Sequence, residues 1–187
     1  MLLNTKEQIV AAVQKAGVVG AGGAGFPTHV KLQADVDTVI VNASECEPLL
    51  YTDKAVLLRH ADLVVEGLEL AMRATGAKRG VVALKAAYKN VVDAVKSAVG
   101  SGKGIEVFLL DNYYPAGDEY LLVYDVTGRI IPEGGIPLHV GVVVNNAVTL
   151  MNVARAASGV CVVTRPVTVT GEVNKKGVYT VPVGTPY

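Results

Sequence analysis

The sequence predicts an α/β fold in which a mostly parallel sheet packs against helices. Short apolar runs rich in β-branched residues occupy positions 37–43, 80–84 and 105–110, and segments of helical periodicity at 54–75 and 88–99 separate them. Strands that alternate with helices pair in parallel, because each helix carries the chain back across the sheet. With 51% hydrophobic and 18% charged residues among 187, the chain can bury a core and does not have the composition of a disordered protein.

The N-terminal segment predicts a helix over residues 5–16. Asn4 or Thr5 can cap this helix, and Gln8 can complete a capping box. Gly17 follows the periodic pattern and is a typical helix stop. A glycine-rich loop comes next, and we expect a short helix after its proline.

The longest helix is predicted over residues 54–75. Asp53 is expected to cap it, and Gly76 lies just beyond its end. His60, in the middle of the helix, is expected to face solvent, and the three histidines of the chain lack the spacing of metal ligands. The following helix, at 88–99, carries valines at helical intervals.

The C-terminal part predicts a helix at 119–126 and a strand at 142–145 that leads into another helix. The tail then changes character. Residues 162–170 alternate in hydrophobicity, a polar turn follows, and 178–183 is again apolar, which predicts a β-hairpin. Because an isolated hairpin is only marginally stable, we expect the chain to enter a second, β-rich domain here and to be part of a longer protein.

Composition excludes several classes of function. Seventeen basic and seventeen acidic side chains cancel, which argues against a nucleic-acid or anionic-lipid binder. Two cysteines, Cys46 and Cys161, are too few to make a Cys-rich zinc or iron–sulfur site alone. The first residues turn polar too early for a signal peptide, and no apolar run reaches the ~18 residues of a membrane span. We therefore expect a cytoplasmic protein with no metal site, no nucleic-acid partner and no transmembrane segment.

The strongest local signal is the glycine loop GAGGAGFP at residues 20–27. It contains G-x-G-x-x-G, a spacing that lets backbone N–H groups approach phosphate oxygens with no Cβ in the way. The dinucleotide fingerprint requires a strand before this loop, whereas a predicted helix precedes it here. The loop therefore favours phosphate or ring contact outside the standard dinucleotide arrangement, and a merely flexible connection is the alternative.

Three further loops follow predicted strands, and ligands of open α/β sheets bind at that edge. Their polar groups suit ribose hydroxyls, a carboxamide, phosphate or a ring carbonyl. The candidates are Asn42, Glu45 and Glu47 after the first strand, Gly117, Asp118 and Glu119 after the third, and Asn145, Asn146 and Thr149 after the fourth. The alternative for the first loop is a solvated acidic loop, and the alternative for the last is simple helix capping by one asparagine. Tyr113 and Tyr114 could stack on a ligand ring, although we expect them to cover the core, and we expect Cys46 to be an inert small residue.

Four motifs stand in order between residues 17 and 150, namely G-A-G-G-A-G-F-P-T-x-x-K-L, V-N-A-x-E-C-E-P, Y-P-A-G-D-E and V-V-N-N-x-x-T. Together they resemble the FMN- and NADH-binding domain shared by the 51-kDa subunit of respiratory complex I, the NADH-binding subunit of the Rnf complex and the cobalamin reductase of propanediol-utilisation microcompartments. The last is the nearest in appearance. The resemblance implies a three-layer, Rossmann-like core with a mostly parallel sheet over residues 1–160, and the start of a soluble ligand-binding β-grasp domain over residues 161–187.

The resemblance also implies a chemistry. FMN would bind noncovalently, accept a hydride from NADH and release electrons singly to iron–sulfur clusters outside this chain. Lys31 and Glu119 would be the catalytic residues, and Phe26 and Glu47 would meet the adenosine half of NADH. The cofactor-binding residues implied by position are Gly20, Gly22, Gly23, Phe26, Lys31, Asn42, Glu45, Glu47, Gly117, Asp118, Glu119, Asn145, Asn146 and Thr149.

The implied partners are NADH, an iron–sulfur acceptor protein or domain, and corrinoid-related or membrane electron-transport subunits. The implied locations are the cytoplasm, a microcompartment lumen or the inner face of the membrane. Ser44 stands where the complex I pattern has aspartate, and Ala34 where it has an aromatic residue. These departures leave a second hypothesis open, a noncatalytic assembly or ligand-binding module that keeps the fold without flavin turnover.

Overall fold

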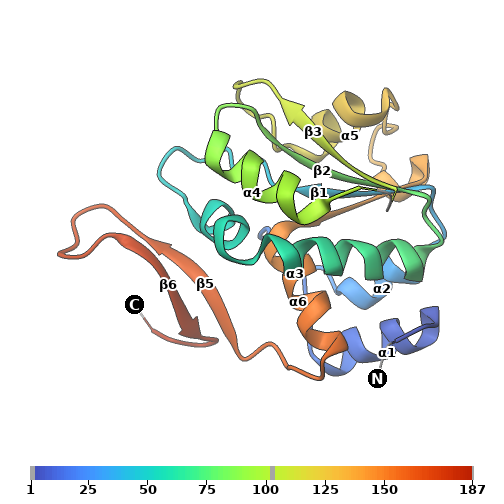
Figure 1. The fold of residues 1–187 in the computed structure, drawn as a ribbon, viewed down its shortest axis with the longest axis horizontal. Helices are drawn as coiled ribbons and strands as arrows, with labels where there is room; N and C mark the ends of the chain where they lie inside the picture. The colour runs from blue at the N-terminus through green and yellow to red at the C-terminus, as the bar shows by residue number, and fades with distance from the viewer. Residues whose placement is uncertain (1–2, 102–103, 187) are drawn as a thin grey trace.

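The computed structural model describes residues 3–101 and 104–186 and confirms the predicted parallel sheet (Figure 1). Four parallel strands stand in the order β3-β2-β1-β4. Their bounds are β1 (Thr38–Asn42), β2 (Arg79–Lys85), β3 (Ile105–Leu110) and β4 (Val142–Asn146). The register sets Asn42 beside Asn146, so the polar ends of β1 and β4 lie together at the carboxyl edge of the sheet.

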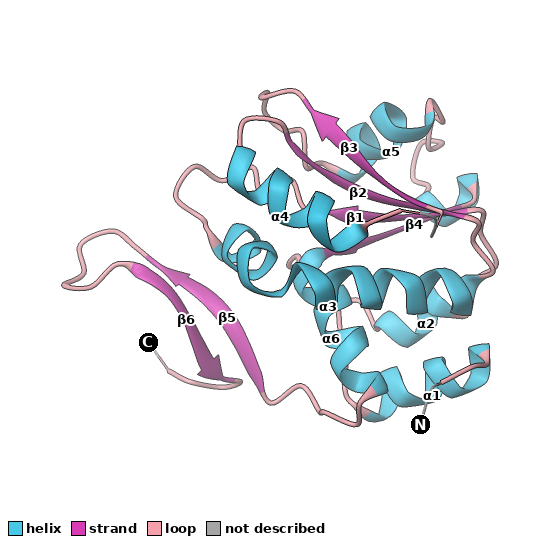
Figure 2. Ribbon diagram, viewed as in Figure 1, coloured by secondary structure: helices cyan, strands magenta, loops and turns pink. Residues whose placement is uncertain are grey.

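Helices cover both faces of the sheet and give the three layers that were expected (Figure 2). One layer consists of α1 (Lys6–Lys15), α2 (Thr28–Leu32), α3 (Thr52–Thr75), α4 (Lys89–Val99) and α6 (Ala147–Ala157). On the other face lies α5 (Glu119–Thr127), and the 3-10 helix η1 (Pro137–Val140) leads into β4. Successive side chains of β1 therefore lie on opposite faces of the sheet, since Val39 and Val41 pack with the first layer and Ile40 packs with α5.

The ends of α1 follow from local sequence. Thr5 caps the helix by accepting a hydrogen bond from the Gln8 backbone N–H, and the Gln8 side chain accepts from the Thr5 N–H. This confirms the predicted capping box, which satisfies two backbone donors that the first turn leaves free. Ile9 and Val13 are each 1% exposed, so the predicted apolar face of α1 is buried.

Two expectations about α3 are wrong. The helix begins at Thr52 after Tyr51, and Asp53 lies within its first turn with a buried carboxyl group that makes no capping bond. Its partner is Asn146, far away in the sequence. His60 does not simply face solvent, because the helix departs from α-helical geometry at this residue (φ −142°, ψ 32°) and the ring is half-buried beneath the C-terminal hairpin.

The close packing of α3 on α6 depends on Gly67. A Cβ at this position would lie 1.9 Å from the carbonyl oxygen of Leu150. Leu150 and Leu68 are both fully buried. Glycine therefore lets the backbones of the two helices approach where they cross, and this contact fixes the start of α6 relative to α3.

The predicted hairpin is present as β5 (Thr164–Val169) paired antiparallel with β6 (Gly177–Pro182). It extends beside α3 (Figure 1). The backbone N–H of Tyr51 donates to Thr168 Oγ1 at 3.0 Å, and the hydroxyls of Thr52 and Thr168 are 2.8 Å apart. The assignment of residues 161–187 to a separate β-grasp domain stays a prediction. In the described ranges we find no helix long and apolar enough to cross a bilayer.

Candidate functional site

A cavity of about 1160 Å³ opens at the carboxyl edge of the sheet, between the α/β core and the hairpin. Loops from widely separated parts of the chain meet there, as the positions of the strands predict. Eight of the proposed cofactor residues line it, namely Gly22, Gly23, Asn42, Glu45, Glu47, Gly117, Asp118 and Asn146. Six do not belong to its lining, namely Gly20, Phe26, Lys31, Glu119, Asn145 and Thr149.

The glycine loop is tied back on itself and to α6. An isolated antiparallel bridge joins Val19 to Pro27, and the Gly20 N–H donates to the Phe26 carbonyl at 2.8 Å. The Ala21 N–H donates to the buried hydroxyl of Thr149 at 2.9 Å. Thr149, which does not line the cavity, thus holds the loop that does. The helix α1 precedes this loop, so the standard dinucleotide arrangement is absent from it.

A second group of contacts holds Gly117 at the end of β1. The Asn42 side chain donates to the Gly117 carbonyl at 2.8 Å, and the Gly117 N–H donates to Cys46 Sγ at 2.9 Å. A Cβ at position 117 would lie 2.3 Å from the Ser44 carbonyl oxygen. Only glycine permits this approach, so the loops after β1 and β3 form one wall of the cavity.

Asp118 has a structural task that sequence reasoning did not assign. Its carboxylate accepts hydrogen bonds from the backbone N–H groups of Tyr120 and Leu121 and so caps α5. Asp118 still lines the cavity, but these bonds engage one of its oxygens. A capping aspartate fixes the position of Glu119, the next residue.

Lys31 and Glu119 lie beside each other, outside the cavity lining. Lys31 Nζ donates to the Val144 carbonyl at 2.8 Å, stands 3.8 Å from the Glu119 carboxylate, and lies 5.6 Å from the centre of the Phe26 ring. Burial lowers the pKa of Lys31, and the negative charge of Glu119 acts in the opposite direction. Lys31 is therefore a cationic side chain on α2 that contacts with β4, α5 and the Phe26 ring hold in place.

Asp53 is the most strongly perturbed acid at the cavity, and the sequence prediction missed it as a site residue. Burial, followed by the nearby negative charge of Glu45, raises its pKa to about 7. A hydrogen bond from Asn146 Nδ2, at 2.8 Å, acts in the opposite direction. An aspartate just before an apolar helix is typical of a cap, and no local signal in the sequence distinguishes it from a buried one.

The expectation that two tyrosines cover the core is wrong. Tyr113 is 37% exposed and Tyr114 is 72% exposed, and Tyr114 lines the cavity. Tyr113 donates its hydroxyl to Asp125, and this contact raises the pKa of the phenol to about 12. The alternation of a strand does not continue into this loop, so the aromatic rings turn outward.

Comparison with known proteins places these loops in a family. The model of the Nuo51 FMN-binding domain matches residues 13–155. The chain is 47% identical over 183 residues to the cobalamin reductase PduS of Citrobacter freundii, a match that covers 97% of this chain and 40% of that protein. It is 38% identical over 174 residues to one subunit of the Na(+)-translocating ferredoxin:NAD(+) oxidoreductase complex of Acetobacterium woodii, with 90% and 39% covered.

A solved structure agrees with these matches. The chain superposes on a crystal structure of an NAD+-reducing [NiFe]-hydrogenase in the H2-reduced state with a TM-score of 0.82 and 27% sequence identity. The match covers 96% of this chain and 37% of the hydrogenase chain. The chain thus spans about two fifths of the length of the cobalamin reductase and of the oxidoreductase subunit, which are 40% and 39% covered.

Proposed function

Because the chain belongs to the family of the Nuo51 FMN-binding domain, we propose that it forms the flavin-binding, electron-entry module of an NADH-oxidising oxidoreductase. The observation that carries this proposal is the cavity in which the glycine loop, residues 42–47, Gly117 and Asn146 meet. Those segments hold the family motifs, and they converge at the sheet edge where α/β folds bind nucleotides.

The lining of this cavity fits a flavin mononucleotide. Its volume of about 1160 Å³ exceeds the ~300–1,000 Å³ usual for one small-molecule site, which leaves room for FMN and part of NADH. A Cβ on Gly23 would meet nothing within 4 Å, so backbone groups there face open space. Among the described residues, Ser44 Oγ is buried in the wall without a hydrogen-bond partner, and a ligand atom can supply one.

The phosphate end of the cofactor suits the start of α6. Asn146 caps this helix, and a helix N-terminus carries a partial positive charge and free N–H donors. The bond from Ala21 to Thr149 keeps the glycine loop beside it. Because its pKa is raised to about 7, Asp53 is only partly ionised at neutral pH, which reduces its repulsion of a phosphate.

FMN, when bound, supplies the redox chemistry by accepting a hydride and passing electrons on singly. The chain itself binds, orients and excludes water. The absence of a Cβ at Gly117 lets the loop after β3 lie directly against Ser44 and Cys46, which fixes this wall of the cavity. Lys31 and Glu119 do not line the cavity; it is the family resemblance that would set the Lys31 charge, fixed by the Val144 carbonyl, near the ring, with Glu119 limiting its movement. Phe26 and Glu47 would contact the adenosine half of NADH.

We also propose an iron–sulfur group outside these 187 residues as the electron acceptor. The names of the relatives, a cobalamin reductase and part of a ferredoxin:NAD(+) oxidoreductase complex, support an electron-transfer role. The higher identity to the cobalamin reductase, 47% against 38%, favours a corrinoid-related task. Such a module would work inside the cell, in the cytoplasm, in a microcompartment or at the inner face of the membrane.

The test is a visible spectrum of the chain mixed with FMN and desalted, followed by anaerobic NADH. Retained flavin absorbance that bleaches with NADH is the expected result. Lys31→Ala and Glu119→Gln should retain their far-UV circular dichroism and slow bleaching at least about tenfold. Lys89→Ala, which removes an exposed lysine on α4, is the matched control. Loss of all flavin on desalting would favour the noncatalytic module instead.

A further inference from the structure

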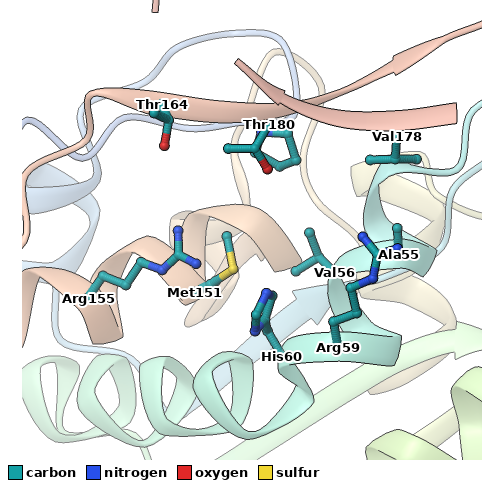
Figure 3. A pocket seen from close by; sticks show the side chains of 10 residues that line it. Ala55, Val56, Arg59, His60, Met151, Arg155, Thr164, Val178 and Thr180 are labelled. Carbon is teal, nitrogen blue, oxygen red and sulfur yellow. The ribbon is translucent and has the colours of Figure 1, made fainter. Parts of the chain in front are cut away.

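A second, smaller cavity lies beneath the hairpin, away from the glycine loop (Figure 3). Its volume is about 70 Å³, and α3, α6 and both hairpin strands form its walls. Pro166 is common to the linings of the two cavities. None of the residues carried over from the family motifs lines the smaller one, so its chemistry has to be inferred from its own side chains.

Three basic side chains line this cavity. Arg59 and His60 come from α3, and Arg155 comes from α6. No aspartate or glutamate belongs to the lining. Within residues 3–101 and 104–186, the side chains of these three residues take part in none of the hydrogen bonds or ion pairs. Arg59 and Arg155 carry positive charges without a counter-charge in the lining, and an anion placed between them offsets their repulsion.

The polar side chains of the cavity also point into the space between the helices and the hairpin. In Figure 3 the guanidinium groups of Arg59 and Arg155 and the ring of His60 rise toward the hairpin, and the hydroxyls of Thr164 and Thr180 point down toward them.

The interruption of α3 at His60 (φ −142°, ψ 32°) lies at this cavity. No proline or glycine, the usual causes of a helix kink, is present at this point of the sequence.

The size of the cavity limits the ligand. The 70 Å³ of the cavity is several times the ~10–15 Å³ that one water needs, so the cavity has room for a ligand of a few non-hydrogen atoms. A tetrahedral oxyanion such as phosphate has five. Arginine forks donate paired hydrogen bonds to oxyanions, and threonine hydroxyls supply further donors.

We propose that Arg59, His60 and Arg155, together with Thr164 and Thr180, form a binding site for a phosphate-sized oxyanion, which joins the hairpin to α3 and α6. The ligand is either free phosphate or the phosphate group of a larger molecule. This inference does not rest on the proposed flavin chemistry.

Isothermal titration calorimetry with inorganic phosphate, against sodium chloride at matched ionic strength, tests the proposal. The expected result is binding to the unmodified chain that weakens at least about tenfold in Arg155→Gln. His60→Gln provides a second variant should Arg155→Gln lose its fold by circular dichroism. Lys176→Gln, which replaces an exposed hairpin lysine, controls for general surface charge and should bind as the unmodified chain does.

Arg165→Gln separates this site from the larger cavity, because Arg165 lines only the latter of the two. Binding that is lost in Arg165→Gln and kept in Arg155→Gln and His60→Gln would overturn the proposal, as would the absence of phosphate binding. A parallel titration with glycerol phosphate shows whether the ligand is free phosphate or the phosphate group of a larger molecule. Tighter binding of the ester than of inorganic phosphate assigns the site to a larger phosphorylated molecule, and weaker binding assigns it to free phosphate.

Discussion

Replacement of Asp53 by asparagine should make the stability of the chain less dependent on pH. Asp53 is 8% exposed, its carboxyl group accepts a hydrogen bond from Asn146 Nδ2 at 2.8 Å, and it lies near the negative charge of Glu45. Asparagine has the same shape, can accept the same hydrogen bond and carries no charge at any pH.

The sign and size follow from the pKa. Burial and Glu45 raise the pKa of Asp53 from 3.8 to about 7, so the folded state binds this proton more tightly than the unfolded state. The resulting stabilisation is complete below about pH 4 and is lost as the pH rises through about 7. A difference of about three pKa units, at ~1.36 kcal/mol each, gives an upper limit of ~4 kcal/mol.

The assay is urea unfolding, followed by circular dichroism, between about pH 4.5 and about pH 8.5. Asp53→Asn should exceed the unmodified chain by only about 1 kcal/mol at the acidic end, because Asp53 of the unfolded chain is already mostly ionised there, and by up to ~4 kcal/mol at the basic end. Asp62→Asn, which removes an exposed acid from the same helix, should differ by no more than ~0.5 kcal/mol throughout. A constant difference between Asp53→Asn and the unmodified chain across this range would refute the reasoning.

Three further substitutions test the backbone contacts. Gly67→Ala places a Cβ 1.9 Å from the Leu150 carbonyl oxygen and should lower the free energy of unfolding by ~3 kcal/mol or more in the same urea assay. Its control is Glu66→Ala, on the exposed face of the helix, which should lower the free energy of unfolding by under ~0.5 kcal/mol. Gly117→Ala places a Cβ 2.3 Å from the Ser44 carbonyl oxygen, so it should displace the cavity wall and weaken FMN binding in a fluorescence titration. An unchanged affinity for FMN would contradict the role of Gly117 in shaping this wall. Asn146→Ala removes the cap of α6 and should cost ~1 kcal/mol; it should also raise the pKa of Asp53 further in a 13C NMR titration.

Local patterns predicted most of the fold. The run at 105–110 coincides with β3, and the apolar segments at 37–43 and 80–84 become β1 and β2 within one residue at each end. All three strands are short, and β1 and β2 are mostly buried, so their apolar, β-branched composition identifies them. The capping box of α1 spans four residues, and everything it needs is adjacent in the chain.

The errors occur where a residue's environment comes from distant sequence. Asp53 is buried because Asn146, 93 positions later, bonds to it. His60 is covered by hairpin strands that begin only at Thr164. The spacing of apolar residues shows which face of a helix is apolar. It does not show whether another part of the chain packs over the polar face. The sequence therefore predicted an ordinary helix cap at Asp53 and a solvent-facing side chain at His60.

The same long-range contacts explain why the larger cavity has a defined shape. Ala21 to Thr149, Asn42 to Gly117 and Asn146 to Asp53 are hydrogen bonds across 128, 75 and 93 positions. Each joins a loop of the cavity to an element of the buried core or to another loop. The loops are therefore ordered by the protein itself, so a cofactor that binds there does not have to supply the free energy of ordering them. Asn146→Ala removes one of these three bonds, and Gly117→Ala displaces the carbonyl that accepts another.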